Sequence, residues 1–191
     1  MNILGIIPAK SHSNRLPGKN KKLLAGVPLF GYTALQCHSS RLLTEWLVST
    51  DDVDIMAMCD RYGWPFAEQP DFGGDLGKLC LHHAASGSWD AVCLLQPTSP
   101  LRHPQDIDAA ISLLEAGPEA EAVVGYVDTK HSHTNGAIFL TRFPILPRIP
   151  LDGPGVVRYL MPVNRSVDID TAFDFWLAEK LLTEKPDFAS M

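Results

Sequence analysis

Acidic residues are absent from the first 44 positions of the chain, although the full sequence contains 22 of them. Five of the 16 lysine and arginine residues fall between Ile6 and Lys22. A segment without carboxylates and rich in cations favours an anion bound near the N-terminus. The whole chain carries a formal charge of −6, which argues against a nucleic-acid partner, because such proteins normally present a basic excess.

Paired cysteines and long apolar runs are also missing. Pro8 and Lys10 interrupt the first apolar run, and no run approaches the length that spans a membrane. We therefore expect a cytoplasmic protein without a membrane partner. The cysteines lie in apolar segments without CxxC spacing, which predicts reduced, buried thiols and no disulfide or zinc site. These are Cys37, Cys59, Cys80 and Cys93.

Two common nucleotide-binding fingerprints are absent. The opening loop matches neither GxGxxG nor GxxxxGK[ST]. The stretch GGDLGK, Gly73 to Lys78, approximates the second pattern but is one residue short and is followed by Leu79. The sequence therefore supports neither a Rossmann dinucleotide site nor a P-loop kinase.

Short apolar runs alternate with helical patterns, and this order predicts an α/β fold. Such runs indicate a mostly parallel sheet with helices on both faces, in one domain spanning residues 1–191. Ligands of such sheets bind beyond the carboxyl ends of the strands. The expected strands are Ile3–Ile7, Trp46–Ser49, Ala91–Leu95, Ala122–Val127 and Ala137–Leu140.

Helix boundaries can also be read from the sequence. Asp51 or Asp52 is placed to cap a helix that runs through Tyr62, with Gly63 after it. Pro104 suits the first turn of another helix, which Gly117-Pro118 would end. The loops that follow strands therefore become the candidate ligand loops.

The first of these loops, Pro8 to Lys22, follows the first strand. Its backbone amides, hydroxyls and cations could surround phosphate oxygens. A solvated basic turn is the alternative. The candidate phosphate ligands are Lys10, Ser11, Ser13, Arg15, Lys19, Lys21 and Lys22.

The stretch SVDIDT, Ser166 to Thr171, holds two carboxylates two positions apart. In extended backbone, Asp168 and Asp170 would point to the same side while Ile169 turns toward the core. Two carboxylates so close to each other require a cation between them, and Mg²⁺ shared with phosphates satisfies this requirement. In the alternative, Asp170 caps the helix that begins at Ala172 and Asp168 is merely exposed.

The stretch LLQPTSPLRHPQDI, Leu94 to Ile107, places a polar loop shaped by prolines after a strand. Gln96, Thr98, Ser99 and Arg102 could be held over the sheet edge, with Arg102 as a partner for a carboxylate. The same residues are also a common turn composition.

Together these stretches resemble the cytidylyltransferases that activate acidic sugars, namely the acylneuraminate (CMP-sialic acid synthetase), nonulosonic acid and 3-deoxy-manno-octulosonate enzymes. The resemblance covers nearly the whole chain and rests on five strings in the family's order. They are IIPAKSHSNRLPGKN, VSTDD, LLQPTSPLR, NGAIF and VDIDT.

The resemblance implies a three-layer Rossmann-like nucleotidyltransferase fold and a Mg²⁺-dependent transfer of CMP from CTP to a sugar acid, with release of pyrophosphate. It implies catalytic roles for Arg15, Lys19, Asp168 and Asp170, the two aspartates also holding the metal. The implied acceptor-binding residues are Gln96, Thr98, Ser99, Arg102 and Asn135. The implied CTP-binding residues are Ala9, Lys10, Ser11, Ser13, Arg15, Lys19, Asn20, Gly74 and Asp75.

The chain also departs from this family. Lys10 stands where the family usually has Arg, and Gly74-Asp75 where it has Ser-Asp. Only Asp128 to Asn135 stand where the family inserts a long dimerisation segment, so the oligomeric state is open. A small phosphonate or other compact acid is therefore an alternative acceptor, and a catalytically weakened nucleotide-binding protein is an alternative function.

Overall fold

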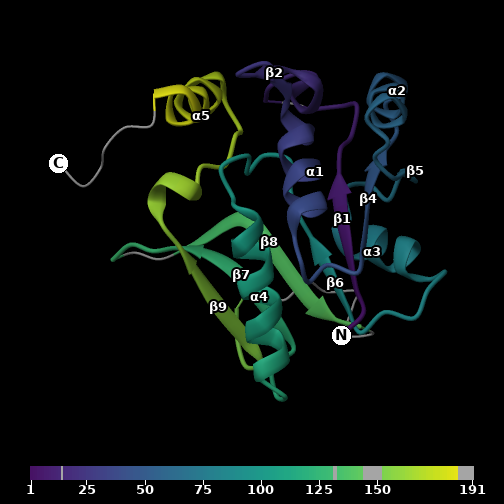
Figure 1. Ribbon diagram of the computed structural model, residues 1–191, viewed down its shortest axis with the longest axis vertical. Helices are drawn as coiled ribbons and strands as arrows, with labels where there is room; N and C mark the ends of the chain where they lie inside the picture. Colours follow the sequence, from purple (N-terminus) through teal and green to yellow (C-terminus); the bar gives the residue numbers. More distant parts are fainter. Residues whose placement is uncertain (14, 131–132, 144–151, 185–191) are drawn as a thin grey trace.

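The computed structural model describes residues 1–13, 15–130, 133–143 and 152–184 (Figure 1). Its central feature is a seven-stranded sheet in the order β5-β4-β1-β6-β8-β7-β9. β8 runs antiparallel to both of its neighbours, whereas every other adjacent pair is parallel. The strands are β1 (Ile3–Pro8), β4 (Glu45–Thr50), β5 (Phe66–Glu68), β6 (Ala91–Leu94), β7 (Ala122–Val127), β8 (Thr134–Arg142) and β9 (Val156–Met161).

The predicted mostly parallel α/β sheet is confirmed, and all five expected strands are present. The sequence missed β5 and β9, which lie at the two edges of the sheet. Neither edge strand is buried along its length: the three residues of β5 and all but Met161 in β9 are at least partly exposed. They therefore lack the continuous apolar run that marked the inner strands.

Helices cover both faces of the sheet. α1 (Leu29–Ser39), α2 (Val53–Tyr62) and α4 (Pro104–Ala116) pack on one face, and α3 (Leu76–Ala84) packs on the other. Side chains in β1 alternate accordingly, with Ile3 and Ile7 in the first apolar layer and Leu4 and Ile6 in the second. All four cysteines are buried and unpaired, as expected.

Local signals set the helix ends as predicted. Asp52 caps α2 by accepting hydrogen bonds from the backbone N–H groups of Asp54 and Ile55. Gly63 ends α2 with φ 67°, a left-handed conformation that glycine adopts without strain. Pro104 is the first residue of α4.

The C-terminal helix α5 (Ala172–Glu184) lies apart from the sheet, next to the hairpin of β2 (Leu23–Leu24) and β3 (Val27–Pro28) (Figure 1). A small apolar cluster joins these elements. Its fully buried members include Leu24 from the hairpin and Ile169 and Ala178 from the C-terminal segment. This packing brings the segment that precedes α5 against the loop that follows β1. No helix in the described ranges is long and apolar enough to cross a membrane.

Candidate functional site

The loop after β1 is fastened to the carboxyl end of β4. The backbone N–H of Ala9 donates to the carbonyl of Ser49, and Thr50 Oγ1 donates to the carbonyl of Ala9, each over 2.7 Å. The N–H and the hydroxyl of Ser11 both donate to the Asp51 carboxylate, over 2.6 and 3.0 Å. The groups that follow β4 therefore fix the course of the loop, and the Ser11 hydroxyl is already engaged within the protein.

The end of this loop forms the short 3-10 turn η1 (Lys19–Lys21). Asn20 is buried, and its Nδ2 donates to the carbonyl of Lys10 over 2.9 Å. Lys21 Nζ lies 2.6 Å from an oxygen of Asp54 and 3.0 Å from one of Asp52. Hydrogen bonds to these two carboxylates raise the pKa of Lys21. Lys21 thus neutralises the carboxylates of Asp52 and Asp54 at the start of α2.

The segment before α5 supplies the predicted pair of carboxylates. Ile169 is fully buried, and its backbone N–H donates to the carbonyl of Thr98 over 2.8 Å. This anchor confirms that Ile169 turns toward the core. Asp168 and Asp170 therefore flank a fixed point at the carboxyl end of the sheet.

Two cations from the opening loop meet Asp170. Arg15 Nη1 lies 2.7 Å from Oδ2, and Lys19 Nζ lies 3.1 Å from Oδ1. Lys19 Nζ also donates to the carbonyl of Ile169 over 2.8 Å. The side chain of Arg15 is 69% exposed, so it can turn toward a ligand without disturbing the core. The structure therefore brings together residues about 150 positions apart that the sequence had linked to phosphate and metal binding.

Asp170 does not cap α5, which removes one alternative reading of this segment. The backbone N–H of Asp174 donates to Thr171 Oγ1 over 3.3 Å, and that of Thr171 donates to Asp174 Oδ2 over 2.7 Å. This reciprocal pair satisfies the start of the helix. The Asp170 carboxylate is consequently available to cations.

Asp168 has a different environment from Asp170. Partial removal from water and the nearby Asp170 charge raise the pKa of its carboxyl group, against opposing effects of a Thr98 hydrogen bond, Lys19 and Arg15. No described lysine or arginine lies within ion-pair distance of it. The carboxylate also lies close to Gly136, since a Cβ built there would be 3.5 Å from Asp168 Oδ2. The raised pKa reflects above all the removal of this carboxyl group from water, which disfavours its charged form.

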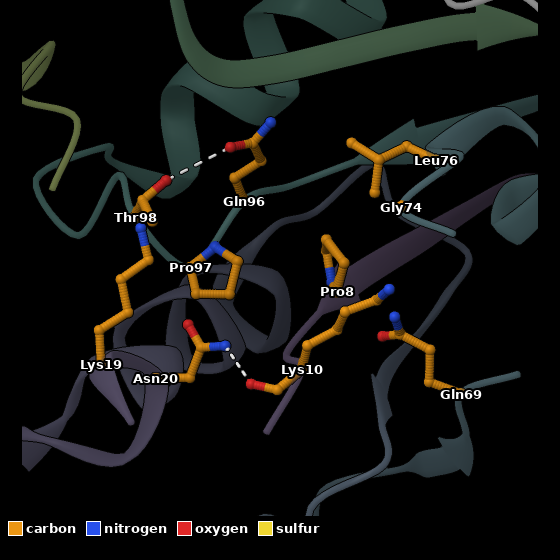
Figure 2. Close-up of a pocket in the computed structure, with 10 residues that line it drawn as sticks. All are labelled: Pro8, Lys10, Lys19, Asn20, Gln69, Gly74, Leu76, Gln96, Pro97 and Thr98. Carbon is orange, nitrogen blue, oxygen red and sulfur yellow. Dashed lines mark hydrogen bonds between the residues drawn. The ribbon is translucent and has the colours of Figure 1, made fainter. Parts of the chain in front are cut away.

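A pocket of about 260 Å³ opens beside these groups (Figure 2). It lies where the loops after β1, β5 and β6 meet. Its volume lies just below the range of roughly 300 to 1,000 Å³ that is typical of small-ligand sites. The lining residues are Pro8, Lys10, Lys19, Asn20, Gln69, Gly74, Leu76, Gln96, Pro97 and Thr98.

The residues predicted to bind an acceptor separate into two groups. Gln96 and Thr98 line the pocket, and Thr98 Oγ1 donates to Gln96 Oε1 over 3.3 Å (Figure 2). Ser99 and Asn135 are buried away from it; Asn135 Nδ2 donates to Ser166 Oγ over 3.1 Å. Asn135 therefore ties β8 to the segment that precedes the carboxylate pair and does not face the pocket.

Arg102 lies in the interior and does not reach the pocket, contrary to its predicted position. It is 1% exposed, and burial lowers its pKa. Its Nη2 donates to Thr33 Oγ1 over 3.0 Å and to Gln36 Oε1 over 2.8 Å, while Nη1 donates to the carbonyl of Ala137. The guanidinium thus joins α1 to β8 instead of facing a ligand carboxylate.

The remaining predicted ligands lie around the loop between β5 and α3 and in the opening loop. Gly74 lines the pocket with φ 88°, a backbone conformation that favours glycine. Asp75 caps α3 by accepting from the N–H of Lys78 over 3.0 Å. Ser13 is partly exposed in the opening loop.

The carboxylate pair can hold a metal ion only together with other ligands. No group of three or more His, Cys, Asp or Glu side chains among the described residues is placed to bind one. Asp168 and Asp170 supply hard oxygen donors, and the cations Arg15 and Lys19 contact Asp170 rather than Asp168. Two such carboxylates suit a hard divalent cation whose other ligands are phosphate oxygens and water.

Sequence reasoning missed several residues that line the pocket, above all Gln69 and Leu76. Gln69 directly follows β5, the short edge strand that the sequence did not reveal. Once β5 is known, the position of Gln69 at the carboxyl end of a parallel strand marks it as a candidate.

A family model described as cytidylyltransferase matches residues 4–139. The chain is 30% identical over 224 aligned positions to the CMP-N,N'-diacetyllegionaminic acid synthase of Legionella pneumophila, covering 95% of this chain and 97% of that protein. It is 28% identical to the N-acylneuraminate cytidylyltransferase of Escherichia coli, over 96% of this chain. The chain spans about half of that relative, 52% of its length.

Solved structures share the fold. A CMP:2-keto-3-deoxy-manno-octonic acid synthetase complexed with CTP superposes with a TM-score of 0.81 at 13% sequence identity. The match covers 97% of this chain and 100% of the other. The shared fold therefore covers nearly the whole chain, whereas the family model matches residues 4–139.

Proposed function

The chain belongs to the cytidylyltransferase family, and from that membership we propose that it transfers CMP from CTP to a nonulosonic or 3-deoxy-ulosonic sugar acid, releasing pyrophosphate. One observation carries the proposal for this chain in particular. Arg15 and Lys19 from the opening loop meet Asp170 from the distant C-terminal segment beside a pocket of about 260 Å³. Cations and carboxylates at one point suit a triphosphate with a metal ion.

The proposed nucleotide lies with its phosphates toward Lys10, Ser13, Arg15 and Lys19. Its nucleoside lies toward the region of Ala9, Asn20, Gly74 and Asp75. Ser11 contributes by fixing the loop on Asp51. In the ligand-free protein Arg15 and Lys19 neutralise Asp170, so phosphate oxygens would replace that carboxylate as their partner.

Asp168 and Asp170 would hold Mg²⁺, which would neutralise phosphate charge and polarise the reacting phosphate when bound. The chain's own contribution is alignment. Gln96 and Thr98 border the space in which the acceptor would lie. An acceptor hydroxyl oxygen would bond to the α-phosphorus and give up its proton to the surrounding water, while the bond from that phosphorus to the bridging oxygen breaks and its electron pair leaves with pyrophosphate. Arg15 and Lys19 would stabilise the negative charge that collects on the departing pyrophosphate.

Because the connection between β7 and β8 is short, a compact acid is the second candidate acceptor. β7 ends at Val127 and β8 begins at Thr134, so no long insertion separates these two strands. The relatives with shared sequence nevertheless favour a sugar acid, because the Legionella relative is a CMP-N,N'-diacetyllegionaminic acid synthase. We further propose that residues 1–191 work as one cytidylyltransferase-like domain in the cytoplasm.

A pyrophosphate-release assay tests the proposal. The purified protein is incubated with Mg²⁺, with CTP, UTP or GTP, and with a panel of nonulosonic acids, 3-deoxy-ulosonic acids and small phosphonates. We expect release only with CTP and a sugar acid. Release only with a compact acid would replace the acceptor class, and CTP binding without release under any combination would support the non-catalytic alternative.

A further inference from the structure

The strand β8 bulges where it passes β7. The register of this strand pair shifts between Val124 and Tyr126. Only Gly125 of β7 therefore lies opposite residues 135–138 of β8. A bulge turns side chains away from the regular pattern of the sheet, and bulges are frequent beside active sites. The bulge in this protein begins with Asn135.

The side chain of Asn135 is fully engaged inside the protein. It is 4% exposed, and its Oδ1 accepts a hydrogen bond from the backbone N–H of Ala137 over 3.1 Å. Its Nδ2 lies 3.1 Å from Met161 Sδ and donates to Ser166 Oγ over 3.1 Å. The Ser166 hydroxyl in turn donates to the carbonyl of Pro162 over 2.9 Å. One amide thus shapes the bulge and fastens the segment that follows β9.

Gly125 provides the space that this amide occupies. A Cβ atom built on Gly125 would lie 2.6 Å from Asn135 Oδ1, well inside van der Waals contact. The amide is the group nearest to that point, so it would have to move. Its movement would break the hydrogen bonds to Ala137 and Ser166. A side chain at position 125 is therefore incompatible with the observed position of Asn135.

Two connections lead from Asn135 to Asp168. The first passes through Ser166, which precedes Asp168 by two positions. The second passes through Gly136, the next residue of the bulge. A Cβ built on Gly136 would lie 3.5 Å from Asp168 Oδ2 and 3.7 Å from Gln96 Oε1. The backbone of the bulge therefore lies against one carboxylate of the pair and beside a side chain that lines the pocket.

We propose that Gly125 and Asn135 are positioning residues, which hold Asp168 in the orientation in which it binds Mg²⁺ together with the phosphates of CTP. The inference rests on the proposed function, because it assumes a nucleotide with its metal ion at Asp168. Removing a group that holds a metal ligand in place typically lowers metal affinity by about 10- to 100-fold. This role replaces the direct contact between Asn135 and the acceptor that the sequence resemblance implied.

Two substitutions break this connection from opposite sides. Asn135→Ala removes the amide. Gly125→Ala keeps every hydrogen-bonding group of the chain, but its added methyl group displaces the amide. Gly5→Ala, in the middle of β1, is the matched control for a glycine in a strand, because its Cβ would instead meet the side chains of Trp46 and Leu43.

Calorimetry of CTP binding with and without Mg²⁺ provides the test. In the wild-type protein we expect Mg²⁺ to raise the affinity for CTP. We expect Asn135→Ala and Gly125→Ala to reduce that gain about tenfold and to leave CTP binding without metal unchanged. Gly5→Ala should lower the midpoint of urea unfolding and keep the full gain.

A double-mutant cycle shows whether Gly125 acts through Asn135. Once the amide is absent, the methyl group of Gly125→Ala has free space. The double variant should therefore lose no more of the Mg²⁺ gain than Asn135→Ala alone, and additive losses would contradict the proposed connection. Ser166→Ala removes only the hydroxyl that accepts from the amide. It should also reduce the gain, and it tests the same connection if the cavity left by Asn135→Ala unfolds the protein.

The outcomes distinguish this inference from the function on which it rests. If the wild-type protein binds no CTP, the proposed function fails. If Mg²⁺ strengthens CTP binding equally in the wild type and in both single variants, only the positioning role fails, even where the variants are less stable. An unchanged gain with a higher KM for the sugar acid in Asn135→Ala would also overturn the inference and assign Asn135 to the acceptor.

Discussion

Asp168 and Asp170 are two positions apart, yet the protein treats their charges differently. Asp170 has Arg15 and Lys19 within 2.7 and 3.1 Å, whereas Asp168 is partly desolvated and its pKa is raised. The two carboxylates and the two cations balance in number, but both cations contact Asp170 and leave Asp168 without an ion-pair partner among the described lysines and arginines. A divalent cation that arrives with a triphosphate would remove this imbalance.

Replacing Asp168 by Asn should therefore abolish catalysis and spare the fold. We expect Asp168→Asn to lower kcat/KM for pyrophosphate release by at least about 100-fold, since a charged ligand of the metal is lost. Because a raised folded-state pKa penalises the ionised group, the variant should be somewhat more resistant to urea at neutral pH. That gain should vanish at acidic pH, where Asp168 is protonated anyway.

Asp60→Asn, at an exposed position on α2, is the control for this pair of measurements and should change neither activity nor stability. Wild-type turnover by Asp168→Asn would refute the proposed role of the carboxylate pair.

For Arg102 we expect a substitution to lower stability rather than catalysis, because the contacts of its side chain are internal. Arg102→Ala removes hydrogen bonds to Thr33, Gln36 and Ala137 and leaves a cavity, so the free energy of unfolding should fall by about 3 kcal/mol. Urea denaturation measures this loss, and Arg41→Ala, at an exposed position, should cost little. If stability is kept while the KM for the acid rises, Arg102 has the acceptor-binding role that the sequence indicated.

At the scale of single elements, α3 is attached to the sheet through a buried polar contact. His83 Nε2 lies 2.8 Å from Ser49 Oγ on β4. Burial and the neighbouring His82 lower the pKa of His83 to about 4. The imidazole is therefore neutral in the folded protein at physiological pH.

This shift predicts a pH dependence of stability. In the unfolded chain His83 takes up a proton near pH 6.5, roughly the ordinary value for histidine, but in the folded protein only near 4. The unfolded state therefore binds more protons in between, and stability should fall as the pH drops through this window. His83→Gln should flatten urea-midpoint curves there, and His38→Gln, at an exposed position, should not. Parallel curves for the wild type and His83→Gln would contradict this prediction.

The segment that carries Asp168 and Asp170 is held in place by an ion pair of Arg165, which lies shortly before them in the sequence. Arg165 Nη2 lies 2.9 Å from Oδ1 of the buried Asp106 at the start of α4, and the Tyr159 hydroxyl donates to the same oxygen over 2.8 Å. Because groups that orient metal ligands affect metal affinity, Arg165→Met should raise the Mg²⁺ concentration for half-maximal activity about tenfold.

Calorimetry provides a second measurement for this loop. CTP binding without metal should be unchanged in Arg165→Met, whereas the gain in affinity on adding Mg²⁺ should shrink. Arg158→Met, which loses an exposed ion pair with Asp152 and the contact of the guanidinium with the Tyr126 ring, both away from the carboxylate pair, is the control. A uniform loss of activity at every Mg²⁺ concentration would indicate a merely structural role for Arg165.

The elements that the sequence predicted well are those with local signals. Pro104, Asp52 and Gly63 mark helix ends through their own backbone or side-chain chemistry, so neighbouring residues were sufficient. β9 contains Arg158 and an exposed Leu160, and only its pairing with β7 reveals it as a strand. Gln69 and Arg102 depend likewise on contacts between distant segments, which the chain pattern alone does not display.

At the scale of the whole molecule, the site is assembled by the sheet. The loops after β1, β5 and β6 meet at one edge because their strands run parallel, and the C-terminal segment closes over them. The alignment with the Legionella relative spans 224 positions, more than the 191 residues of this chain. The relative therefore has segments without a counterpart here, and the short β7–β8 connection is where we expect the largest of them.

The central claim is that the protein joins CMP to a sugar acid. Phosphorus NMR of a reaction with CTP, Mg²⁺ and a nonulosonic or 3-deoxy-ulosonic acid tests it most directly. The proposal predicts one new phosphodiester signal and pyrophosphate in equal amounts, both lost with Asp168→Asn. Intact CTP in the presence of every acid, with a folded protein that binds the nucleotide, would contradict the claim.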